Sequence, residues 1–462
     1  MRIVSHGKPS IASMILLCLV VVCLSWMPQR HGTAAAKPRV PAAFIFVPAQ
    51  PLMDDVVHIR LSGLPPRQPI TIKARMRLAG RAWRSRAVFV SDARGSVDLG
   101  RLAPVNGSYA GVDPMGLFWA MKMDEPASTP AEQTAAAALD LAPVVTRFEA
   151  ESSKGRSLAS AELTRRWAKP GVRVTDVREG GLVGRLFEPA ELGRHPGVIV
   201  LSGSEGGTKD WEAALLASRG YAAFALAYFK SGELPEELVN IPLEYLKNGL
   251  DWFRARGSVN GERVAVMGAS KGAELALVLG ATFPEIKAVV AYAPTSAVGL
   301  GIDRNGVSKG SSWTYRGKPL PCMTPRATPA FTSQFASGRP VRLRELHKTS
   351  LENKETLEKA TIPVENIHGA VLLISGGDDQ MGPSSAHGDR VISRLRANKH
   401  PYPFQHLSYK SAGHGIYGYY IPTTVSTTSG RWALGGTPAG NANALADSRP
   451  KVLQFLRQNL GK

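Results

Sequence analysis

Cysteine is scarce in this 462-residue chain, which contains only three. Cys18 and Cys23 lie in an apolar N-terminal stretch, and Cys322 stands alone in the segment LPCMTP. If the N-terminal stretch is removed, no internal disulfide can form, so the core alone must hold the fold together. We interpret Cys322 as a loop or half-buried thiol, because no flanking pattern marks it as a nucleophile.

Several motifs of other function classes are also missing. No Cys or His spacing typical of zinc sites is present, and no dinucleotide-binding fingerprint follows an expected strand. The segment GSEGG lacks the GK[ST] ending of a phosphate-binding loop. We therefore predict neither a metal nor a cofactor.

Acidic residues are few relative to basic ones. The chain has 37 Asp and Glu against 56 Lys and Arg, a formal net charge of +19. Such an excess favours anionic partners, but the basic residues are dispersed, without the basic stripe and aromatics of nucleic-acid-binding modules. We expect a small-molecule partner and no nucleic acid; the oligomeric state stays open.

One long apolar run lies near the N-terminus. A basic start with Arg2 and Lys8 leads into MILLCLVVVCLSWM, and Ala34 and Ala36 then form an A-x-A cleavage site. We predict a secretory signal over residues 1–36 and an exported protein, periplasmic or secreted. An uncleaved membrane anchor is the alternative, disfavoured because the run is shorter than the ~20 residues that a span needs.

The remaining chain changes in pattern along its length. VVHIRLSGLPP, ITIKARMRLAG and RAWRSRAVFVSDARGSVDLG alternate between apolar and polar residues, which predicts a small antiparallel β-sandwich over 37–125. An Ala-, Pro- and Ser-rich linker is expected over 126–163. From 164 to 462, strands alternate with amphipathic helices, which predicts an α/β domain with a parallel sheet. A polar segment at about 296–363 is expected to form a lid-like insertion, with a surface excursion as the alternative.

Two serines fit the G-x-S-x-G pattern of a nucleophile on a strand-to-helix turn: Ser270 in VMGASKGAEL and Ser308 in RNGVSKGSSW. The turn needs a strand before it and a helix after it. Residues 263–267 and 273–279 supply these around Ser270, whereas polar, turn-rich segments flank Ser308. We predict that Ser270 is the nucleophile and that the second match is accidental.

A serine nucleophile needs a base, and the base needs an acid that orients it. In α/β-hydrolase chains the order is serine, acid, histidine. The strand GAVLLIS leads into a loop with two aspartates, and Asp379 is preferred to Asp378 because it fits the G-x-x-D shape from Gly376. A helix N-cap or an Asx turn is the alternative for either.

The base is expected after the acid. His414 lies in a glycine-flanked loop that follows a strand, and we predict it as the base. Three other histidines are expected in a helix, a polar connector and a strand: His387, His400 and His406. Two backbone amides are predicted to stabilise the oxyanion: that of Lys271 and that of Ser204 or its neighbour in the bend LSGSEGG. The Lys271 side chain is expected to be solvated.

These segments resemble the acyl-CoA thioesterase and bile acid-CoA:amino acid N-acyltransferase family along nearly the whole mature chain. PLMDDVVHIRLSGLPPRQPITIKARM and GSYAGVDPMGLFWAM are similar to its N-terminal region. ALAYFKSGELPEELVNIPLEYLKNGLDWF, GASKGAELAL, LLISGGDDQ and SAGHG are similar to its catalytic region. The resemblance implies an α/β-hydrolase domain and a serine hydrolase that cleaves acyl thioesters, with Ser270, Asp379 and His414 as its triad.

The chain departs from the family pattern at several points. The amino-acid-conjugating members use a cysteine nucleophile, so the serine here favours hydrolysis over acyl transfer to an amine. No aromatic follows the aspartates in DDQMGPSS, and GIYGYYIPTT replaces the usual acidic, proline-rich stretch after the histidine. Both segments border the acyl site. An exported carboxylesterase or amide hydrolase and a basic envelope-binding protein with a remnant hydrolase domain remain alternatives.

Overall fold

The computed structural model describes residues 41–124, 140–303, 306, 310–416 and 420–461. The predicted signal over 1–36 and Ser308 lie outside the described residues. The signal, and the interpretation of the Ser308 match as accidental, therefore stay predictions. The chain from Ala42 onward forms one compact unit. In the described ranges, no helix is both long and apolar enough to cross a bilayer.

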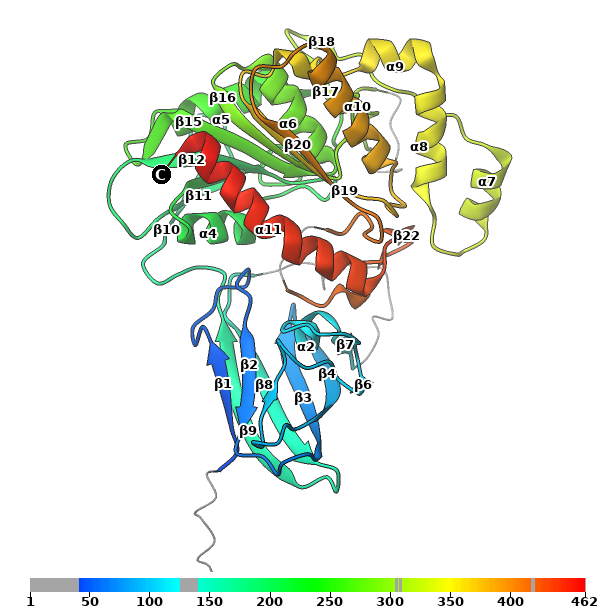
Figure 1. Cartoon of the computed structure of the whole chain (residues 1–462). Coiled ribbons are helices and arrows are strands. Elements are labelled where there is room, and N and C mark those ends of the chain that lie inside the picture. Colours follow the sequence, from blue (N-terminus) through cyan, green and yellow to red (C-terminus); the bar gives the residue numbers. More distant parts are fainter. Residues whose placement is uncertain (1–40, 125–139, 304–305, 307–309, 417–419, 462) are drawn as a thin grey trace, which may run out of the picture. The chain divides into compact units, whose positions relative to one another are not determined.

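Two antiparallel sheets form the N-terminal region (Figure 1). Residues along their long strands alternate between buried and exposed positions, as the period-two pattern predicts. The smaller sheet has the order β1 (Ala43–Val47), β2 (His58–Ser62), β5 (Val97–Asp98). The larger has the order β6 (Asn106–Gly107), β4 (Arg81–Val90), β3 (Pro69–Leu78), β8 (Val144–Ser152), β9 (Ser157–Arg165), and β7 (Lys122–Met123) pairs with β4.

The larger sheet extends into the segment that we predicted to be a linker. β8 pairs with β3, and β9 pairs with β8, so residues 144–163 belong to the larger N-terminal sheet. The predicted end of the sandwich at 125 and the predicted linker over 126–163 therefore need correction. Residues 144–150 alternate strictly between buried and less buried positions, and the buried side needs the sandwich core. The Ala- and Pro-rich composition just upstream hid this strand signal; residues 125–139 lie outside the described residues.

An eight-stranded sheet dominates the C-terminal region. From β13 onward its neighbouring strands pair in parallel, and β10 and β11 are antiparallel additions at one edge. Its order is β10 (Arg173–Val177), β11 (Gly184–Glu188), β13 (Ala222–Leu226), β12 (His195–Leu201), β15 (Val259–Ala269), β16 (Ile286–Tyr292), β19 (Ala370–Gly376), β20 (Phe404–Tyr409). With helical crossovers, this is the strand order of the α/β-hydrolase fold, which confirms the predicted fold class.

Helices cover both faces of this sheet. One face packs against α4 (Asp210–Ser218) and α11 (Pro438–Leu460). The other packs against α5 (Leu243–Arg254), α6 (Lys271–Thr282) and α10 (Ser384–Ala397). Helix α5 is amphipathic, as expected for helices of this region, because the apolar residues that recur at helical spacing on one face are all buried: Leu243, Leu246, Leu250 and Phe253. Since both faces are covered, the central strands are continuous apolar runs.

The remaining elements lie in loops and insertions. A short helix, α2 (Gly116–Trp119), is buried in the N-terminal region. Between β16 and β19 the chain forms β17 (Trp313–Tyr315), β18 (Lys318–Pro319), α7 (Pro329–Ala336), α8 (Leu343–Glu352), α9 (Lys354–Ala360) and η1 (Val364–Asn366), with β17 paired to β14 (Ile241–Pro242). After β20 come η2 (Thr423–Val425), β21 (Thr428–Ser429) and β22 (Trp432–Ala433).

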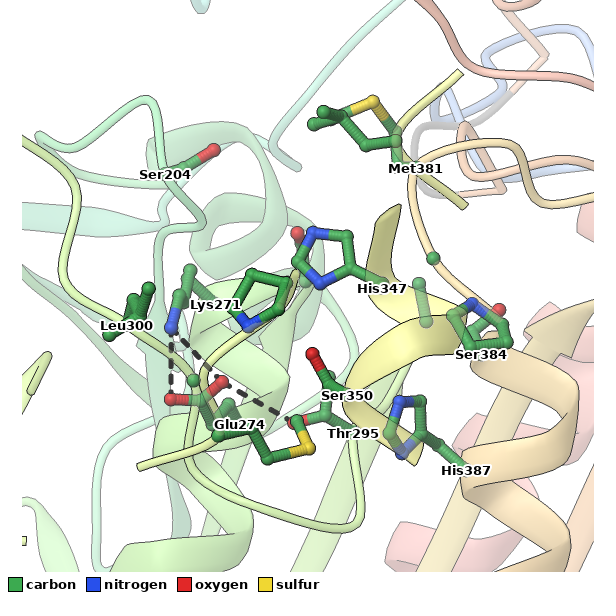
Figure 2. Close-up of a pocket in the computed structure, with 18 of the residues that line it drawn as sticks. Ser204, Lys271, Glu274, Thr295, Leu300, His347, Ser350, Met381, Ser384 and His387 are labelled. Atoms are coloured by element: carbon green, nitrogen blue, oxygen red, sulfur yellow. Dashed lines mark hydrogen bonds and ion pairs between the residues drawn. The ribbon is translucent and has the colours of Figure 1, made fainter. Parts of the chain in front are cut away.

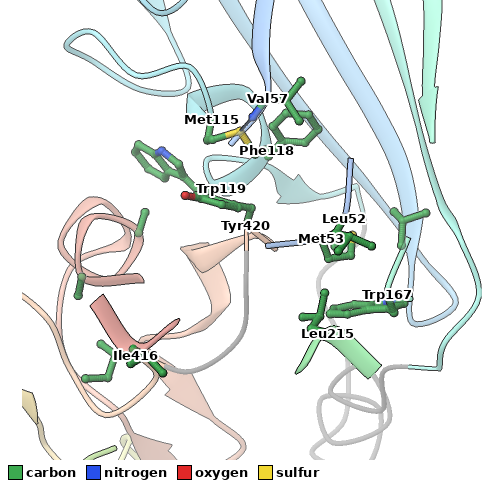
Figure 3. Close-up of a cluster of buried hydrophobic side chains, with 14 of the residues drawn as sticks. Leu52, Met53, Val57, Met115, Phe118, Trp119, Trp167, Leu215, Ile416 and Tyr420 are labelled. Carbon is green, nitrogen blue, oxygen red and sulfur yellow. Dashed lines mark hydrogen bonds between the residues drawn. The ribbon is translucent and has the colours of Figure 1, made fainter. Parts of the chain in front are cut away.

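One hydrophobic cluster joins the N-terminal sheets to the face of the large sheet that α4 and α11 cover (Figure 3). Met53 and Trp119 come from the N-terminal region, and Leu215 and Tyr420 from the C-terminal region. Beside it, the Arg449 guanidinium donates to Asp54 at 3.0 Å and to Glu212 at 2.8 Å. All three side chains of this network are at least 94% buried.

We expect Arg449→Ala to lower the free energy of unfolding by about 3 kcal/mol, because two buried carboxylates lose a shared cation. The loss falls at the lower end for a broken buried pair, since Asp54 keeps its ion pair with Arg219. Urea denaturation measures it. Lys451→Ala on the same helix breaks a solvent-exposed pair and should change stability by less than about 0.5 kcal/mol. Equal losses in the two variants would contradict the role given to the buried network.

Candidate active site

Ser270 lies in a sharp turn between the end of β15 and the start of α6. Its φ is 56° and its ψ is −120°, a left-handed backbone that is uncommon for a non-glycine residue. Its N–H donates to the Tyr292 carbonyl of the neighbouring strand at 2.9 Å. The strand and helix predicted on either side of Ser270 are both confirmed.

The glycines of the motif are required by the closeness of the backbone. A Cβ at Gly268 would lie 2.2 Å from the carbonyl oxygen of Gly272, and a Cβ at Gly272 would lie 2.3 Å from that of Ser202. Neither approach is possible for a real side chain. The turn can therefore form only with glycine at both positions.

Asp379 follows β19 and its side chain is fully buried. One carboxylate oxygen accepts the Met381 N–H at 2.9 Å, and the other accepts the Ser384 hydroxyl at 2.6 Å. The second oxygen also lies 2.9 Å from Nδ1 of His414. Asp378 does not face this histidine, because one of its oxygens accepts the Gly436 N–H at 2.9 Å. The preference for Asp379 agrees with this arrangement.

Asp379 and His414 alter one another's pKa. Burial by itself raises the pKa of Asp379. The adjacent His414 and the hydrogen bonds to the carboxylate lower this pKa by a larger amount, so the net change is downward. Burial lowers the pKa of His414, but the Asp379 carboxylate, with a smaller contribution from Glu205, raises it above 6.5. The pair is therefore an ionised carboxylate beside an imidazole whose Nδ1 it orients.

All five residues predicted from the sequence line one cavity: Ser204, Ser270, Lys271, Asp379 and His414. They come from the segments that follow β12, β15, β19 and β20. The first three of these strands pair in parallel directly or through β16, and β20 continues the series. Their carboxyl ends therefore meet at one edge of the sheet, where ligands bind in open α/β folds.

The two amides predicted as oxyanion donors belong to Lys271 and Ser204. Lys271 is the first residue of α6, so its N–H has no acceptor within the helix. Ser204 lies in the bend after β12. Glu205 braces this bend, because its carboxylate accepts the Gly203 N–H at 3.2 Å and pairs with Lys209.

The expectation that the Lys271 side chain is solvated is wrong. It is only 13% exposed, and its Nζ donates to both oxygens of Glu274 at 3.1 Å (Figure 2). The Nζ also donates to the Ser312 hydroxyl at 2.7 Å. Glu274 also accepts the indole N–H of Trp313 at 2.8 Å. Ser312 and Trp313 belong to the insertion after β16, which packs on α6, and no local sequence pattern indicates this packing.

The predicted insertion at about 296–363 contributes to the cavity wall. Helix α8 provides Leu346, His347 and Ser350, and the preceding segment provides Leu300 and Met323. Sequence reasoning missed His347 and Ser350, since it considered only histidines that follow the acid and gave no role to hydroxyls in the insertion.

Helix α8 is hydrogen-bonded to the acid loop, the segment after β19 that carries Asp379. The Arg344 guanidinium donates to the carbonyls of Gly377 at 2.8 Å and Asp379 at 3.1 Å. These two bonds connect the cavity wall formed by the insertion to the loop that carries the buried carboxylate.

The three histidines not chosen as the base lie where the sequence places them. His387 is in α10, but it too lines the cavity. His400 lies in the connector before β20 and bonds the Gly369 carbonyl at 3.0 Å. His406 is in β20, 2.7 Å from the Ser375 hydroxyl and 3.0 Å from Asp389.

We expect Gly268→Ala to lower the free energy of unfolding by about 1–3 kcal/mol, because the added methyl group collides with the backbone of the turn. Labelling of the protein by a serine-reactive fluorophosphonate should fall as Ser270 is displaced. Gly257→Ala is the matched control, since a Cβ there meets nothing within 4 Å. Urea denaturation and labelling rates check both variants; equal behaviour of the two would refute the steric requirement.

Comparison with known proteins gives the same family in both regions of the chain. The profile of the acyl-CoA thioester hydrolase/BAAT N-terminal region matches residues 54–179, and that of the BAAT/acyl-CoA thioester hydrolase C-terminal region matches residues 241–462. The first match spans β8 and β9, in keeping with the corrected extent of the N-terminal region.

Full-length relatives agree with the profiles. Acyl-coenzyme A thioesterase 1 of Rattus norvegicus is 30% identical over 417 residues, which cover 88% of this chain and 94% of the relative. Mitochondrial acyl-coenzyme A thioesterase 2 of Homo sapiens is 29% identical over 433 residues, covering 92% and 85%. Bile acid-CoA:amino acid N-acyltransferase of Mus musculus is 30% identical over 430 residues, covering 90% and 97%. The chain therefore belongs to the acyl-CoA thioester hydrolase and bile acid-CoA:amino acid N-acyltransferase family.

Proposed function

We propose that the protein hydrolyses acyl thioesters, with CoA as the leaving group, through Ser270, His414 and Asp379. The observation that carries the proposal is the convergence of these three residues on one cavity, with Asp379 bonded to Nδ1 of His414. Relatives named acyl-coenzyme A thioesterases support the choice of substrate class.

The chemistry follows from the roles of the three side chains. His414 removes the proton of the Ser270 hydroxyl as the oxygen attacks the thioester carbonyl. The amides of Lys271 and Ser204 stabilise the negative oxygen of the tetrahedral intermediate. The C–S bond then breaks, and the leaving thiol takes the proton from His414.

Water completes the cycle. His414 removes a proton from a water molecule that attacks the acyl-enzyme, a second tetrahedral intermediate forms, and its collapse returns the proton to Ser270. The carboxylic acid leaves. Asp379 stays ionised throughout, because its role is to hold Nδ1–H of His414 and to stabilise the imidazolium.

Hydrolysis is proposed rather than acyl transfer to an amine, since the nucleophile is a serine. An ester or amide hydrolase would use the same machinery, and the relatives named acyl-coenzyme A thioesterases favour a thioester. Export after removal of residues 1–36 is a separate proposal, tested by N-terminal sequencing of the mature protein.

We expect Ser270→Ala to abolish both fluorophosphonate labelling and the release of CoA thiol from acyl-CoA, with kcat falling at least about a thousandfold. Ser308→Ala carries the same substitution in the other G-x-S-x-G match and should keep both. Thiol release is followed with a chromogenic thiol reagent. Labelling that survives in Ser270→Ala would refute the nucleophile, and hydrolysis of p-nitrophenyl esters without any acyl-CoA hydrolysis would refute the leaving group.

The pH dependence of kcat/KM should reflect the pKa of the proposed base, His414. His414 must be neutral to accept a proton, and its raised pKa places the acidic limb of kcat/KM at higher pH than an ordinary histidine would. Asp379→Asn removes the charge that raises this pKa, so the limb should move to lower pH while kcat falls about 10³–10⁴-fold. Asp378→Asn, the neighbouring substitution, should leave the midpoint in place. A midpoint that does not move in Asp379→Asn would contradict the pairing with His414.

A further inference from the structure

Beyond the proposed catalytic residues, the cavity is lined by polar side chains that bond to one another or to Asp379, namely Glu274, Thr295 and Ser384. Three further polar side chains line it: His347 and Ser350 from α8, and His387 from α10. Figure 2 shows them around the same space. The proposed mechanism uses none of them. Each carries a polar atom that bonds to no described group, and their donors and acceptors define what the cavity can hold.

His387 presents a fixed donor. Its Nδ1 accepts the backbone N–H of Ser296 at 3.1 Å, and an N–H can only donate, so the ring proton lies on Nε2. Burial, with His347 and Arg390 nearby, lowers the pKa of His387 to about 3, so the ring is neutral. No described group accepts the Nε2 proton.

Ser350 and His347 add groups that can both donate and accept. Ser350 is 1% exposed, and its hydroxyl makes no hydrogen bond to a described group. Neither ring nitrogen of His347 bonds to a described group, and burial, followed by Lys271, lowers its pKa to about 4. A neutral imidazole offers one donor and one acceptor.

The charged groups Lys271 and Glu274 in the cavity wall pair with each other, so they do not require a charged ligand. The Lys271 ammonium has its three donors occupied by Glu274 and Ser312, and the Glu274 carboxylate also accepts from Trp313. The pair is therefore neutral and satisfied. The unpartnered polar atoms are uncharged, and a hydroxyl, which donates and accepts, complements them.

The size of the cavity limits the ligand further. Its volume is about 170 Å³, and a cavity of about 150 Å³ holds a molecule the size of benzene. CoA is far larger, so only the acyl half of the substrate can lie inside. A sixteen-carbon chain is also too large to lie wholly inside this volume. Apolar side chains complete the wall and would contact a short carbon skeleton: Leu300, Met323, Leu346 and Met381.

We infer that the cavity selects a short acyl group that carries a hydroxyl, rather than a long alkyl chain. This inference rests on the proposed function, since it assigns the cavity to the acyl half of the substrate. A short alkyl group would bury Ser350 and His387 without partners. A site built to bond a hydroxyl discriminates strongly against the analogue that lacks it.

The test compares three acyl groups, 3-hydroxybutyryl, butyryl and palmitoyl, each as its CoA thioester and its p-nitrophenyl ester. We expect kcat/KM to be at least about tenfold higher for 3-hydroxybutyryl than for butyryl, and lowest for palmitoyl, in both series. Ser350→Ala should reduce the ratio of 3-hydroxybutyryl to butyryl about tenfold. Its stability in urea should not fall, because it removes a hydroxyl without a described partner. Lys348→Ala, an exposed position on the same helix, is the control and should keep the ratio.

The outcomes separate the two proposals. A hydroxyl preference on p-nitrophenyl esters with no cleavage of CoA thioesters would support the cavity assignment and overturn thioester hydrolysis. Faster cleavage of palmitoyl than of butyryl esters in both series would overturn the cavity assignment and leave thioester hydrolysis standing. A ratio that Ser350→Ala does not change would also overturn the assignment, and no cleavage in either series would overturn both proposals.

Discussion

The strained backbone at Ser270 is the constraint on which the rest of the cavity depends. A non-glycine residue in this conformation costs about 1–3 kcal/mol, and surrounding structure must hold it there. The bond from its N–H to the Tyr292 carbonyl ties the turn to β16, and the glycines at 268 and 272 let strand, turn and helix approach closely. The turn projects Ser270 at the sheet edge where the loops after β12, β19 and β20 meet.

Burial of charge ties the insertion to this turn. Lys271 directly follows Ser270, and its ion pair with Glu274 is completed by Ser312 and Trp313 of the insertion. Removing either charge would leave the other buried without its opposite charge, which is strongly unfavourable. Arg344 supplies a second attachment, at the acid loop. The cavity wall is thus fastened to both loops that carry the central groups of the site.

Local signals were sufficient for much of the fold. The alternating segments became β2, β3 and β4, and the apolar stripe of α5 is buried as the 3.6-residue period requires. Strand β8 was missed although it alternates equally well, because Ala- and Pro-rich sequence directly precedes it. A strand's membership in a sheet depends on its partner, here β3, which lies about seventy residues earlier in the chain.

The sequence alone determined which candidate residues line one cavity: Ser270, Asp379 and His414 follow strands whose order brings them to one edge of the sheet. From the flanking elements it also predicted which of the two G-x-S-x-G serines lies on a strand-to-helix turn, and the structure has that strand and helix around Ser270. Only the tertiary structure decided the environment of Lys271 and the places of His347, Ser350 and His387 in the cavity wall. Those depend on how the insertion packs over α6, and packing between distant segments is set by complementary shape and buried polar partners, which no local period or spacing records.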